Sequence, residues 1–166
     1  KVRKYRLRRL RKKMEEHDVA GLLLFNQINT RYAVDATNMQ VWCSHYETRC
    51  VFVLLEGPVV LFDYAYHPYL AEGIPTIDEY RIIPSFYFFG SGNRSVEFVK
   101  EFASQIADLI NKHGGGNSRL AIDRLSLIGC EALRDKGLQL IEGEQITETA
   151  RAIKSKEELQ LMKFSM

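Results

Sequence analysis

Cysteine is scarce in this sequence, with three cysteines among 166 residues. A small, odd number argues against a disulfide framework and is typical of a reducing compartment, so we expect a cytoplasmic location. Long apolar runs are missing too, since none approaches the roughly 20 residues that cross a bilayer. The basic start leads into an amphipathic stretch rather than the apolar core of a signal peptide. These absences favour a globular domain without a membrane partner.

Acidic residues are absent from the first 13 positions, which hold nine of the 23 basic residues. The rest of the chain has 14 basic and 21 acidic residues, a net charge of −7. A basic arm that binds nucleic acid usually extends from a basic or neutral body, because an acidic body repels phosphates. We therefore interpret residues 3–17 as an amphipathic helix with a solvated basic face, and expect no nucleic-acid partner.

Clusters of metal ligands are also lacking. Cys43, His45 and Cys50 offer three ligands at irregular spacing, whereas structural zinc sites use four ligands in paired units. A two-metal centre needs bridging carboxylates that hold the ions roughly 3.5–4 Å apart. The acidic residues considered for this role are scattered singly along the chain: Asp35, Asp63, Asp78 and Asp123. We expect neither a metal site nor a catalytic residue in this chain.

The glycine run between His113 and Asn117 does not have the context of a phosphate-binding loop. Such a loop precedes a helix, whose N-terminus faces the anion. This run follows a predicted helix and precedes a predicted strand, so we interpret it as a helix stop and turn.

The sequence does contain alternating apolar strands and amphipathic helices. Helices are predicted where apolar residues recur on one helical face, and strands where short β-branched or aromatic runs end at Gly or Pro. The predicted helices are 3–17, 95–113 and 126–136, with another starting near 144 and a turn or short helix at 27–32. The predicted strands are 19–25, 50–55, 59–62, 80–83, 119–123 and 138–142. The hairpin at 50–64 has two arms that are apolar on both faces, so its strands should be central. We predict an α/β fold with a mixed β-sheet flanked by helices.

The segment from Arg31 to Arg49 mixes charged, polar and aromatic residues between two predicted strands. It is too long for a simple turn, and long loops in compact domains are often functional. One interpretation is structural: Tyr32 and Trp42 cover the sheet while Arg31 and Asp35 form a local ion pair. The other is that this segment closes over an active site. The candidate residues of that pocket rim are Arg31, Tyr32, Asp35, Asn38, Trp42, His45, Tyr46 and Arg49.

Within this candidate rim, the side chains suggest two roles. Trp42 and Tyr46 would form an apolar wall. Arg31 or Arg49 would bind a substrate carboxylate through charge-assisted hydrogen bonds.

Four consecutive aromatic residues follow Pro84 and Ser85. They are Phe86, Tyr87, Phe88 and Phe89. Exposed aromatic patches mark interfaces, so we expect these residues to contact a partner. The alternative is a buried edge strand.

The end of the chain predicts a domain boundary. Residues 151–158 have the composition of an exposed linker entering a helix, with Ser155 as N-cap and two glutamates in the first turn. The apolar stripe that follows is about one heptad long, and so short a helix needs a packing partner. We therefore expect a domain at 1–150, with 151–166 as a hinge and the first helix of a following domain.

These segments carry a resemblance to a known family. The stretch RAIKSKEEL at 151–159 resembles the hinge between the two domains of creatinase, prolidase and aminopeptidase P. The order of predicted elements is similar to the small N-terminal α/β domain of these enzymes. NTRYAVDATNMQVW at 29–42, HGGGNSRLA at 113–121 and EGEQITE at 142–148 look like the branch that contains the dimethylsulfoniopropionate lyases. CSHYE at 43–47 does not match the lyase pattern.

The resemblance implies a parent enzyme whose chemistry lies in a C-terminal "pita-bread" domain. That domain binds two divalent metal ions (Mn, Zn, Fe or Co) through two Asp, one His and two Glu. Family members are often homodimers with the N-terminal domain at the interface. The implied role of this chain is to support dimerisation and the rim of the pocket. The implied reaction is cleavage of an Xaa-Pro peptide bond, as in a dipeptidase, or of another C–N or C–S bond in a small molecule.

A different class of function stays open. The chain would then be a stand-alone binding module that uses its basic N-terminal helix for nucleic acid or an acidic membrane surface. Steep salt dependence of DNA binding would identify such a module.

Overall fold

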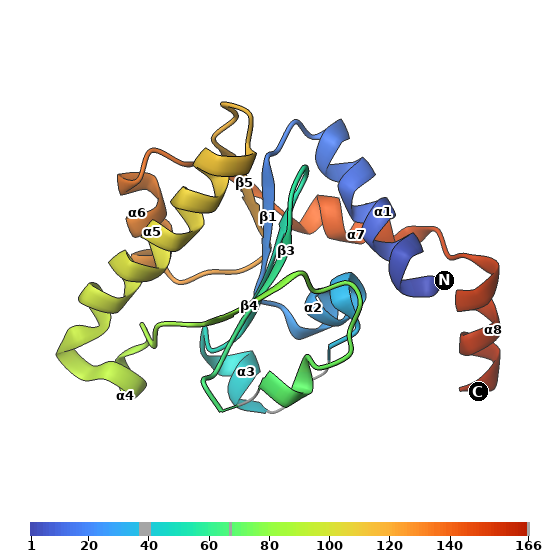
Figure 1. Ribbon diagram of the computed structural model, residues 1–166, viewed down its shortest axis with the longest axis horizontal. Coiled ribbons are helices and arrows are strands. Elements are labelled where there is room, and N and C mark those ends of the chain that lie inside the picture. Colours follow the sequence, from blue (N-terminus) through green and yellow to red (C-terminus); the bar gives the residue numbers. More distant parts are fainter. Residues whose placement is uncertain (37–40, 67, 166) are drawn as a thin grey trace.

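The computed structural model describes residues 1–36, 41–66 and 68–165. A six-stranded β-sheet forms the central layer of this part, with helices on both faces (Figure 1). The strands are β1 (Gly21–Leu24), β2 (Cys50–Leu54), β3 (Val59–Asp63), β4 (Glu79–Ile82), β5 (Arg119–Ile122) and β6 (Gln139–Glu142). The helices are α1 (Val2–Glu16), α2 (Gln27–Val34), α3 (Val41–His45), α4 (Phe88–Ser91), α5 (Ser95–His113), α6 (Leu127–Asp135), α7 (Glu144–Ala152) and α8 (Lys156–Phe164), with short 3₁₀ turns η1 (Pro68–Leu70) and η2 (Gly92–Arg94). The predicted α/β fold with a mixed, helix-flanked sheet is confirmed.

The sheet has the order β4-β3-β2-β1-β5-β6. β2 is antiparallel to β1 and β3, whereas the pairs β3–β4, β1–β5 and β5–β6 are parallel. Five strands therefore run in one direction and end at the same edge of the sheet, which we call the carboxyl edge. β2 runs the other way and starts at this edge. The segments that follow the five strands and the segment that precedes β2 are thereby brought together.

The hairpin strands are central, as their sequence predicts, because β2 and β3 are buried along their whole length. One apolar core lies between the sheet and helices α5 and α6, and contains Phe52, Phe62 and Phe102. A second core on the opposite face joins the sheet to α1, α2 and α7, and contains Leu10, Leu22 and Ile146. Each of these helices therefore packs its apolar face, which repeats every 3.6 residues, against the sheet. The central strands are apolar on both sides, so both faces of the sheet can be covered.

The region between β1 and β2 has more helix than its sequence predicts. Asn26 caps α2 by accepting a hydrogen bond from the backbone N–H of Ile28, and Asp35 ends it in a left-handed conformation with φ of 65°. α3 then begins at Val41. The prediction of a long loop at 31–49 is therefore wrong in part, because this region contains the end of α2 and the whole of α3.

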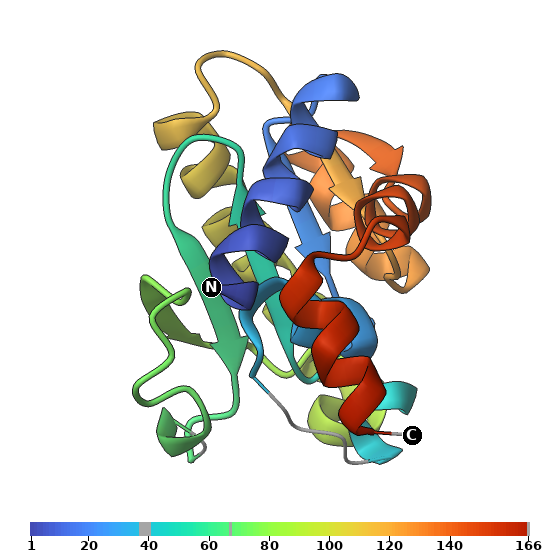
Figure 2. The same ribbon diagram turned by 90° about the vertical axis from the view of Figure 1, so that its right-hand side faces the viewer.

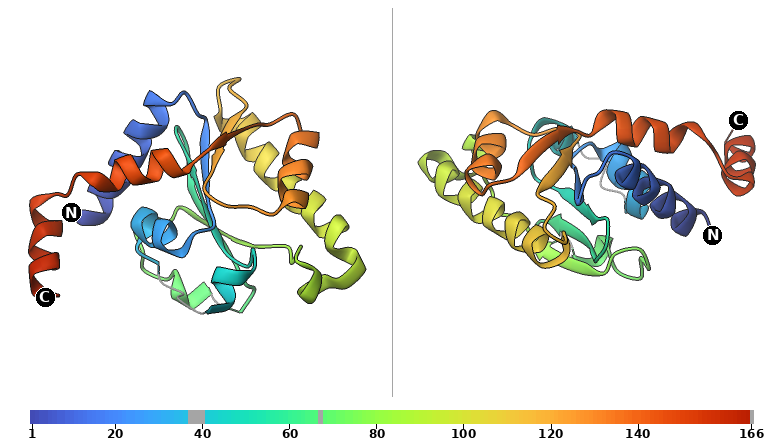
Figure 3. Two further views of the ribbon diagram at one scale, coloured as in Figure 1. Left: turned by 180° about the vertical axis from the view of Figure 1, so that it is seen from behind. Right: turned by 90° about the horizontal axis from the view of Figure 1, so that it is seen from above.

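The carboxyl edge carries helices α2, α3 and α4, which lie at the lower end of the sheet in Figure 1. Figure 3 shows α8 as an arm at the periphery, beyond α1 and α7, and Figure 2 shows the same helix from the front. These two regions contain the residues that the sequence singles out for function.

Candidate functional site

Four aromatic rings from two distant segments meet at the carboxyl edge. We call Trp42, Tyr46, Tyr87 and Phe89 the aromatic patch. The ring centroids of Trp42 and Tyr46 are 4.7 Å apart, and those of Trp42 and Phe89 are 5.1 Å apart. Tyr46 stacks on Tyr87 at 4.8 Å with an interplanar angle of 30°. Two of the eight predicted rim residues and two of the four predicted interface residues therefore lie on one surface.

The sheet topology explains why these segments meet. Trp42 and Tyr46 lie just before β2, the strand that starts at the carboxyl edge. Tyr87 and Phe89 follow β4, which ends there. The contact between the two segments could not be predicted from the sequence of either segment alone.

A layer of hydroxyl groups lies beside the aromatic patch. The hydroxyl oxygens of Tyr64 and Tyr87 are 3.2 Å apart. Burial by itself would raise the pKa of Tyr87, but hydrogen bonds from the side chains of Tyr64, Ser85 and Trp42 outweigh it and lower that pKa. Burial and the hydrogen bond with Tyr87 raise the pKa of Tyr64. The two hydroxyls therefore share one hydrogen bond, in which either oxygen can be the donor.

Arg49 belongs to the interior and not to the rim. Its Nε lies 2.7 Å from Oδ2 of Asp63, and both side chains are completely buried. The contact is an ion pair without ideal hydrogen-bond direction, and the Arg49 nitrogens have no hydrogen-bond acceptor within the described part of the chain. The expectation that Arg49 binds a substrate carboxylate is corrected, because the guanidinium is enclosed and its charge is balanced by Asp63.

The predicted interface residues do not behave as one group. Phe86 is fully buried and packs against Phe25 and Phe102, so its assignment to an interface is wrong. Phe88 and Phe89 are 72% and 73% exposed and lie in α4, so the alternative of a buried edge strand is also wrong. Phe86 points inward because the chain turns from β4 toward the α5 face, where the larger apolar core needs a side chain.

The first part of the predicted rim lies elsewhere, around α2. Tyr32 is largely buried and its hydroxyl donates to the carbonyl oxygen of Ala150 at 3.1 Å. Burial and the nearby charge of Glu158 raise the pKa of Tyr32 to about 12. Asp35 pairs with Arg3 at 2.8 Å, so the ion pair expected with Arg31 is wrong. Asn38 lies outside the described residues.

A cleft of about 640 Å³ separates α2 from α7 and α8. Its lining includes Arg31, Tyr32, Asp35, Arg151, Glu158 and Met162. The N-cap predicted at Ser155 is confirmed, and Glu158 completes a reciprocal capping box with it. Glu158 also accepts a hydrogen bond from Arg6 of α1 at 2.7 Å. This cleft is thus a junction between α8 and the rest of the domain.

The basic helix α1 uses four arginines for contacts within the chain. Arg9 donates to the carbonyl oxygens of Thr149 and Ala150. Arg11 donates to the carbonyl oxygens of Leu54 and Gly57 at the hairpin. Arg3 and Arg6 form the ion pairs described above. Four of the nine basic residues at positions 1–13 thus make contacts within the chain.

Other candidate sites from the sequence do not assemble. Within 1–36, 41–66 and 68–165 there is no group of three His, Cys, Asp or Glu side chains that could hold a metal ion. Cys43 and Cys50 are buried, and burial raises the pKa of both thiols. The run after His113 is a turn, since Gly115 and Gly116 have φ of 60° and 89°. No described helix is long and apolar enough to cross a membrane.

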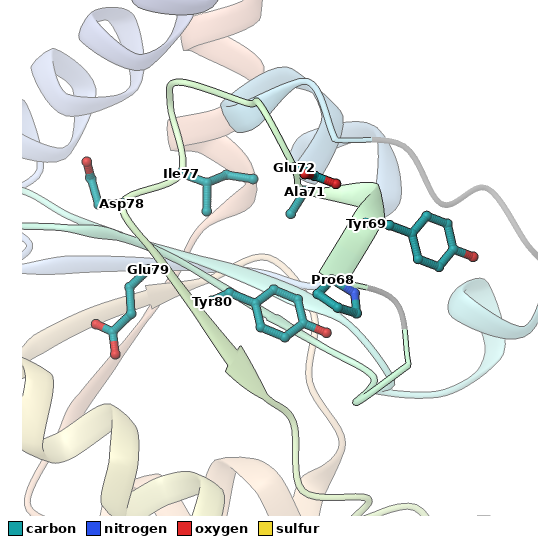
Figure 4. A pocket seen from close by; sticks show the side chains of 8 residues that line it. All are labelled: Pro68, Tyr69, Ala71, Glu72, Ile77, Asp78, Glu79 and Tyr80. Atoms are coloured by element: carbon teal, nitrogen blue, oxygen red, sulfur yellow. The ribbon is translucent and has the colours of Figure 1, made fainter.

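A second hollow lies beside the edge strand β4, under the η1 turn. Figure 4 shows Tyr80 below Pro68, with Asp78 and Glu79 pointing away from each other. The Asp78 carboxylate accepts the backbone N–H of Val59, and Glu79 pairs with Arg81. This hollow is open and its strand carboxylates already have partners, so it is a weaker candidate than the aromatic patch.

Comparison with known proteins supports an assignment to a family. Residues 6–153 match the model of the creatinase/prolidase N-terminal domain. The chain is 37% identical over all its 166 residues to dimethylsulfoniopropionate lyase DddP of Roseovarius nubinhibens. It is 35% identical over 162 residues to the enzyme of the same name from Roseobacter denitrificans. The chain spans only 37% and 36% of the length of these two relatives.

Solved structures with low sequence identity share the fold. An Xaa-Pro aminopeptidase from Streptococcus thermophilus superimposes with a TM-score of 0.65 at 15% identity, covering 91% of this chain and 99% of that one. A dipeptidase from Pyrococcus horikoshii has a TM-score of 0.63 at 16% identity, covering 95% of this chain and 39% of that one. The first match is nearly coextensive with the solved chain, so a domain of this fold occurs as a separate structure.

Proposed function

Because the chain belongs to the creatinase/prolidase N-terminal domain family, we propose that it is the non-catalytic first domain of a metal-dependent pita-bread enzyme and that its aromatic patch borders the substrate pocket. The observation that carries this proposal is the meeting of Trp42 and Tyr46 with Tyr87 and Phe89 at the carboxyl edge. Ligands of open α/β sheets bind preferentially outside the carboxyl ends of the strands. Of these aromatic side chains Phe89 is exposed and the other three are half-buried, and together they supply contact area for a small substrate or a partner subunit.

The two metal ions that the family implies do not fit the residues described here, which offer no ligand cluster. In this proposal the ions belong to a following domain, and this chain takes no step in the chemistry. Its contribution is to exclude water and to position the substrate. His45 lies beside the aromatic patch, with its ring 6.4 Å from that of Tyr46, and extends the rim.

The relatives with the higher identity suggest which reaction to test first. Two relatives with the name of dimethylsulfoniopropionate lyase are 35–37% identical, whereas the peptidase structures are 15–16% identical. Cleavage of dimethylsulfoniopropionate breaks a C–S bond and releases dimethyl sulfide, acrylate and a proton. An Xaa-Pro dipeptide with added Mn²⁺ is the second probe, because the fold alone does not decide between the two reactions.

The test uses the complete gene product and its Trp42→Ala variant. We expect kcat/KM for the cleaved probe to fall by about tenfold or more, since Trp42 contributes the largest ring of the aromatic patch. Leu127→Ala is the control, because Leu127 is an exposed apolar residue of α6. An unchanged kcat/KM in Trp42→Ala would contradict the proposal that the aromatic patch borders the substrate pocket. Hydrolysis of the dipeptide by the 166-residue chain alone would overturn its non-catalytic role.

A further inference from the structure

The two edge strands of the sheet differ in their charge pattern. Within residues 1–36, 41–66 and 68–165, β4 and β6 each have a neighbouring strand on one side only. Each therefore presents a row of backbone N–H and C=O groups to which another strand can bond. β6 has a single charged residue, Glu142, and no residue of opposite charge to face it. β4 instead carries opposite charges two residues apart, at Glu79 and Arg81.

Glu79 and Arg81 lie on one face of β4 and are held in place there. Oε1 of Glu79 is 2.6 Å from Nε of Arg81, and the Arg81 guanidinium lies 5.9 Å from the centre of the Phe62 ring. Phe62 belongs to the core on the α5 face, so both charged side chains are on that face. Tyr80 packs into the core on the opposite face, because side chains alternate along a strand.

We propose that β4 pairs in antiparallel orientation with β4 of a second copy of this chain, about a twofold axis at Tyr80. In this register Glu79 of each copy faces Arg81 of the other, so two ion pairs of opposite charge form across the contact. An axis at Glu79 or at Arg81 would put like charges opposite each other. The favourable register also places Tyr80 of one copy diagonal to Ile82 of the other, within reach of its ring. Ile82 is 58% exposed, and this contact would cover it.

The alternative role of charges on an edge strand is to prevent pairing. That role needs charges that repel an incoming strand, whereas Glu79 and Arg81 match a second copy of the same strand. The contact lies along the free side of β4 and is separate from the aromatic patch. It goes beyond the function proposed above and does not depend on it.

Charge reversal in the 166-residue chain tests this contact. A contact through a strand of 4 residues is small. We therefore expect a weak dimer, with a dissociation constant on the order of 0.1 mM by sedimentation equilibrium. Glu79→Arg makes arginine face arginine, and Arg81→Glu makes glutamate face glutamate, so each variant alone should dimerise at least about tenfold more weakly. An equimolar mixture of the two variants restores opposite charges across the contact and should dimerise within about threefold of the unmodified chain.

A second ion pair supplies the matched controls. Arg94 and Glu97 also form an ion pair, at 2.7 Å, but lie at the start of α5. Glu97→Arg and Arg94→Glu change the net charge by the same amounts as the β4 variants. Separately and as a mixture, they should associate as the unmodified chain does. Far-UV circular dichroism verifies that all four variants are folded.

The mixture separates a contact between copies from an effect within one copy. Weakened dimers of Glu79→Arg and Arg81→Glu that recover in the mixture, with unchanged controls, support the inference. A chain that stays monomeric up to about 1 mM overturns it. Dimers that charge reversal does not weaken, or that do not recover in the mixture, overturn it as well. None of these results alters the proposed function, which the activity of Trp42→Ala in the complete gene product decides.

Discussion

The guanidinium of Arg49 and the carboxylate of Asp63 lie together inside the domain, where both side chains are inaccessible to water. Removing two charges from water costs several kcal/mol per ion, which their mutual attraction repays only in part. Asp63 also accepts the backbone N–H of Tyr64. The pair thus fixes the start of β2 and the end of β3, next to the tyrosine that contacts Tyr87.

Replacing Arg49 with Met leaves a buried carboxylate without its counter-charge. We expect Arg49→Met to lower the free energy of unfolding by about 3–5 kcal/mol, measured by urea denaturation of the 166-residue chain. Arg3→Met is the matched control, because the Arg3–Asp35 pair is 44% and 33% exposed and should contribute at most about 1 kcal/mol. Similar losses in the two variants would contradict the structural role assigned to Arg49.

Residue type alone could not separate the roles of the two arginines at the ends of the 31–49 segment. Arg31 and Arg49 look equivalent in the sequence, yet Arg31 is exposed at the cleft and Arg49 is buried. The difference depends on Asp63, the last residue of β3, which becomes a neighbour only through the β2–β3 pairing. When strand register determines the partner of a side chain, that partner cannot be predicted from the residues nearby in the sequence.

At the scale of elements, α1 and α8 are held together through one carboxylate. Glu158 caps the N-terminus of α8 with one oxygen and accepts Arg6 of α1 with the other. Burial by itself would raise the pKa of Glu158, but the backbone hydrogen bond from Ser155 and the Arg6 side chain outweigh it and lower that pKa. A lowered pKa means that ionised Glu158 stabilises the folded state. This stabilisation is present above the ordinary carboxylate range and is lost as the pH falls through the lowered pKa.

Removing the Glu158 carboxylate should increase local unfolding of the already exposed segment that joins α7 to α8. Trypsin can cleave after Lys154 and Lys156, and we expect Glu158→Ala to increase these rates by about 2- to 30-fold, as follows from losing a cap worth about 0.5–2 kcal/mol. Glu157→Ala is the control, since Glu157 lies in the same helical turn but outside the capping box. Mass spectrometry of the products gives the rate at each site. Equal acceleration in both variants would show that Glu158 does not hold α8 against α1.

Elements with a complete local pattern were predictable from the sequence. The α5 stripe, the central hairpin and the Ser155 cap follow from periodicity, β-branched runs and capping chemistry, and all three are confirmed. The two parts of the aromatic patch were predicted separately. Trp42 and Tyr46 were expected at a pocket rim, and Tyr87 and Phe89 at an interface. Joining the halves requires knowing that β2 alone runs against the other strands, which depends on long-range pairing.

At the scale of the whole molecule, the aromatic patch and the α8 arm lie apart. Figure 1 shows α3 and α4 well to one side of α8, across the width of the sheet. A domain that continues from α8 would start at a distance from the aromatic patch. A second subunit could reach the patch directly, so we propose that the rim and the predicted interface are one contact, made with the partner subunit's catalytic domain.

Charge placed on α4 tests this arrangement in the complete gene product. Phe88 is 72% exposed next to the aromatic patch, so Phe88→Asp would put a carboxylate into the proposed contact between subunits. We expect the dimer dissociation constant, measured by sedimentation velocity, to rise by about 30-fold or more, since a desolvated aromatic at the centre of an interface is worth about 2 kcal/mol. Leu127→Asp is the matched control, because Leu127 is 80% exposed on α6 and should leave the constant unchanged. A Phe88→Asp dimer as tight as the unmodified one would place the interface elsewhere and assign the aromatic patch to substrate alone.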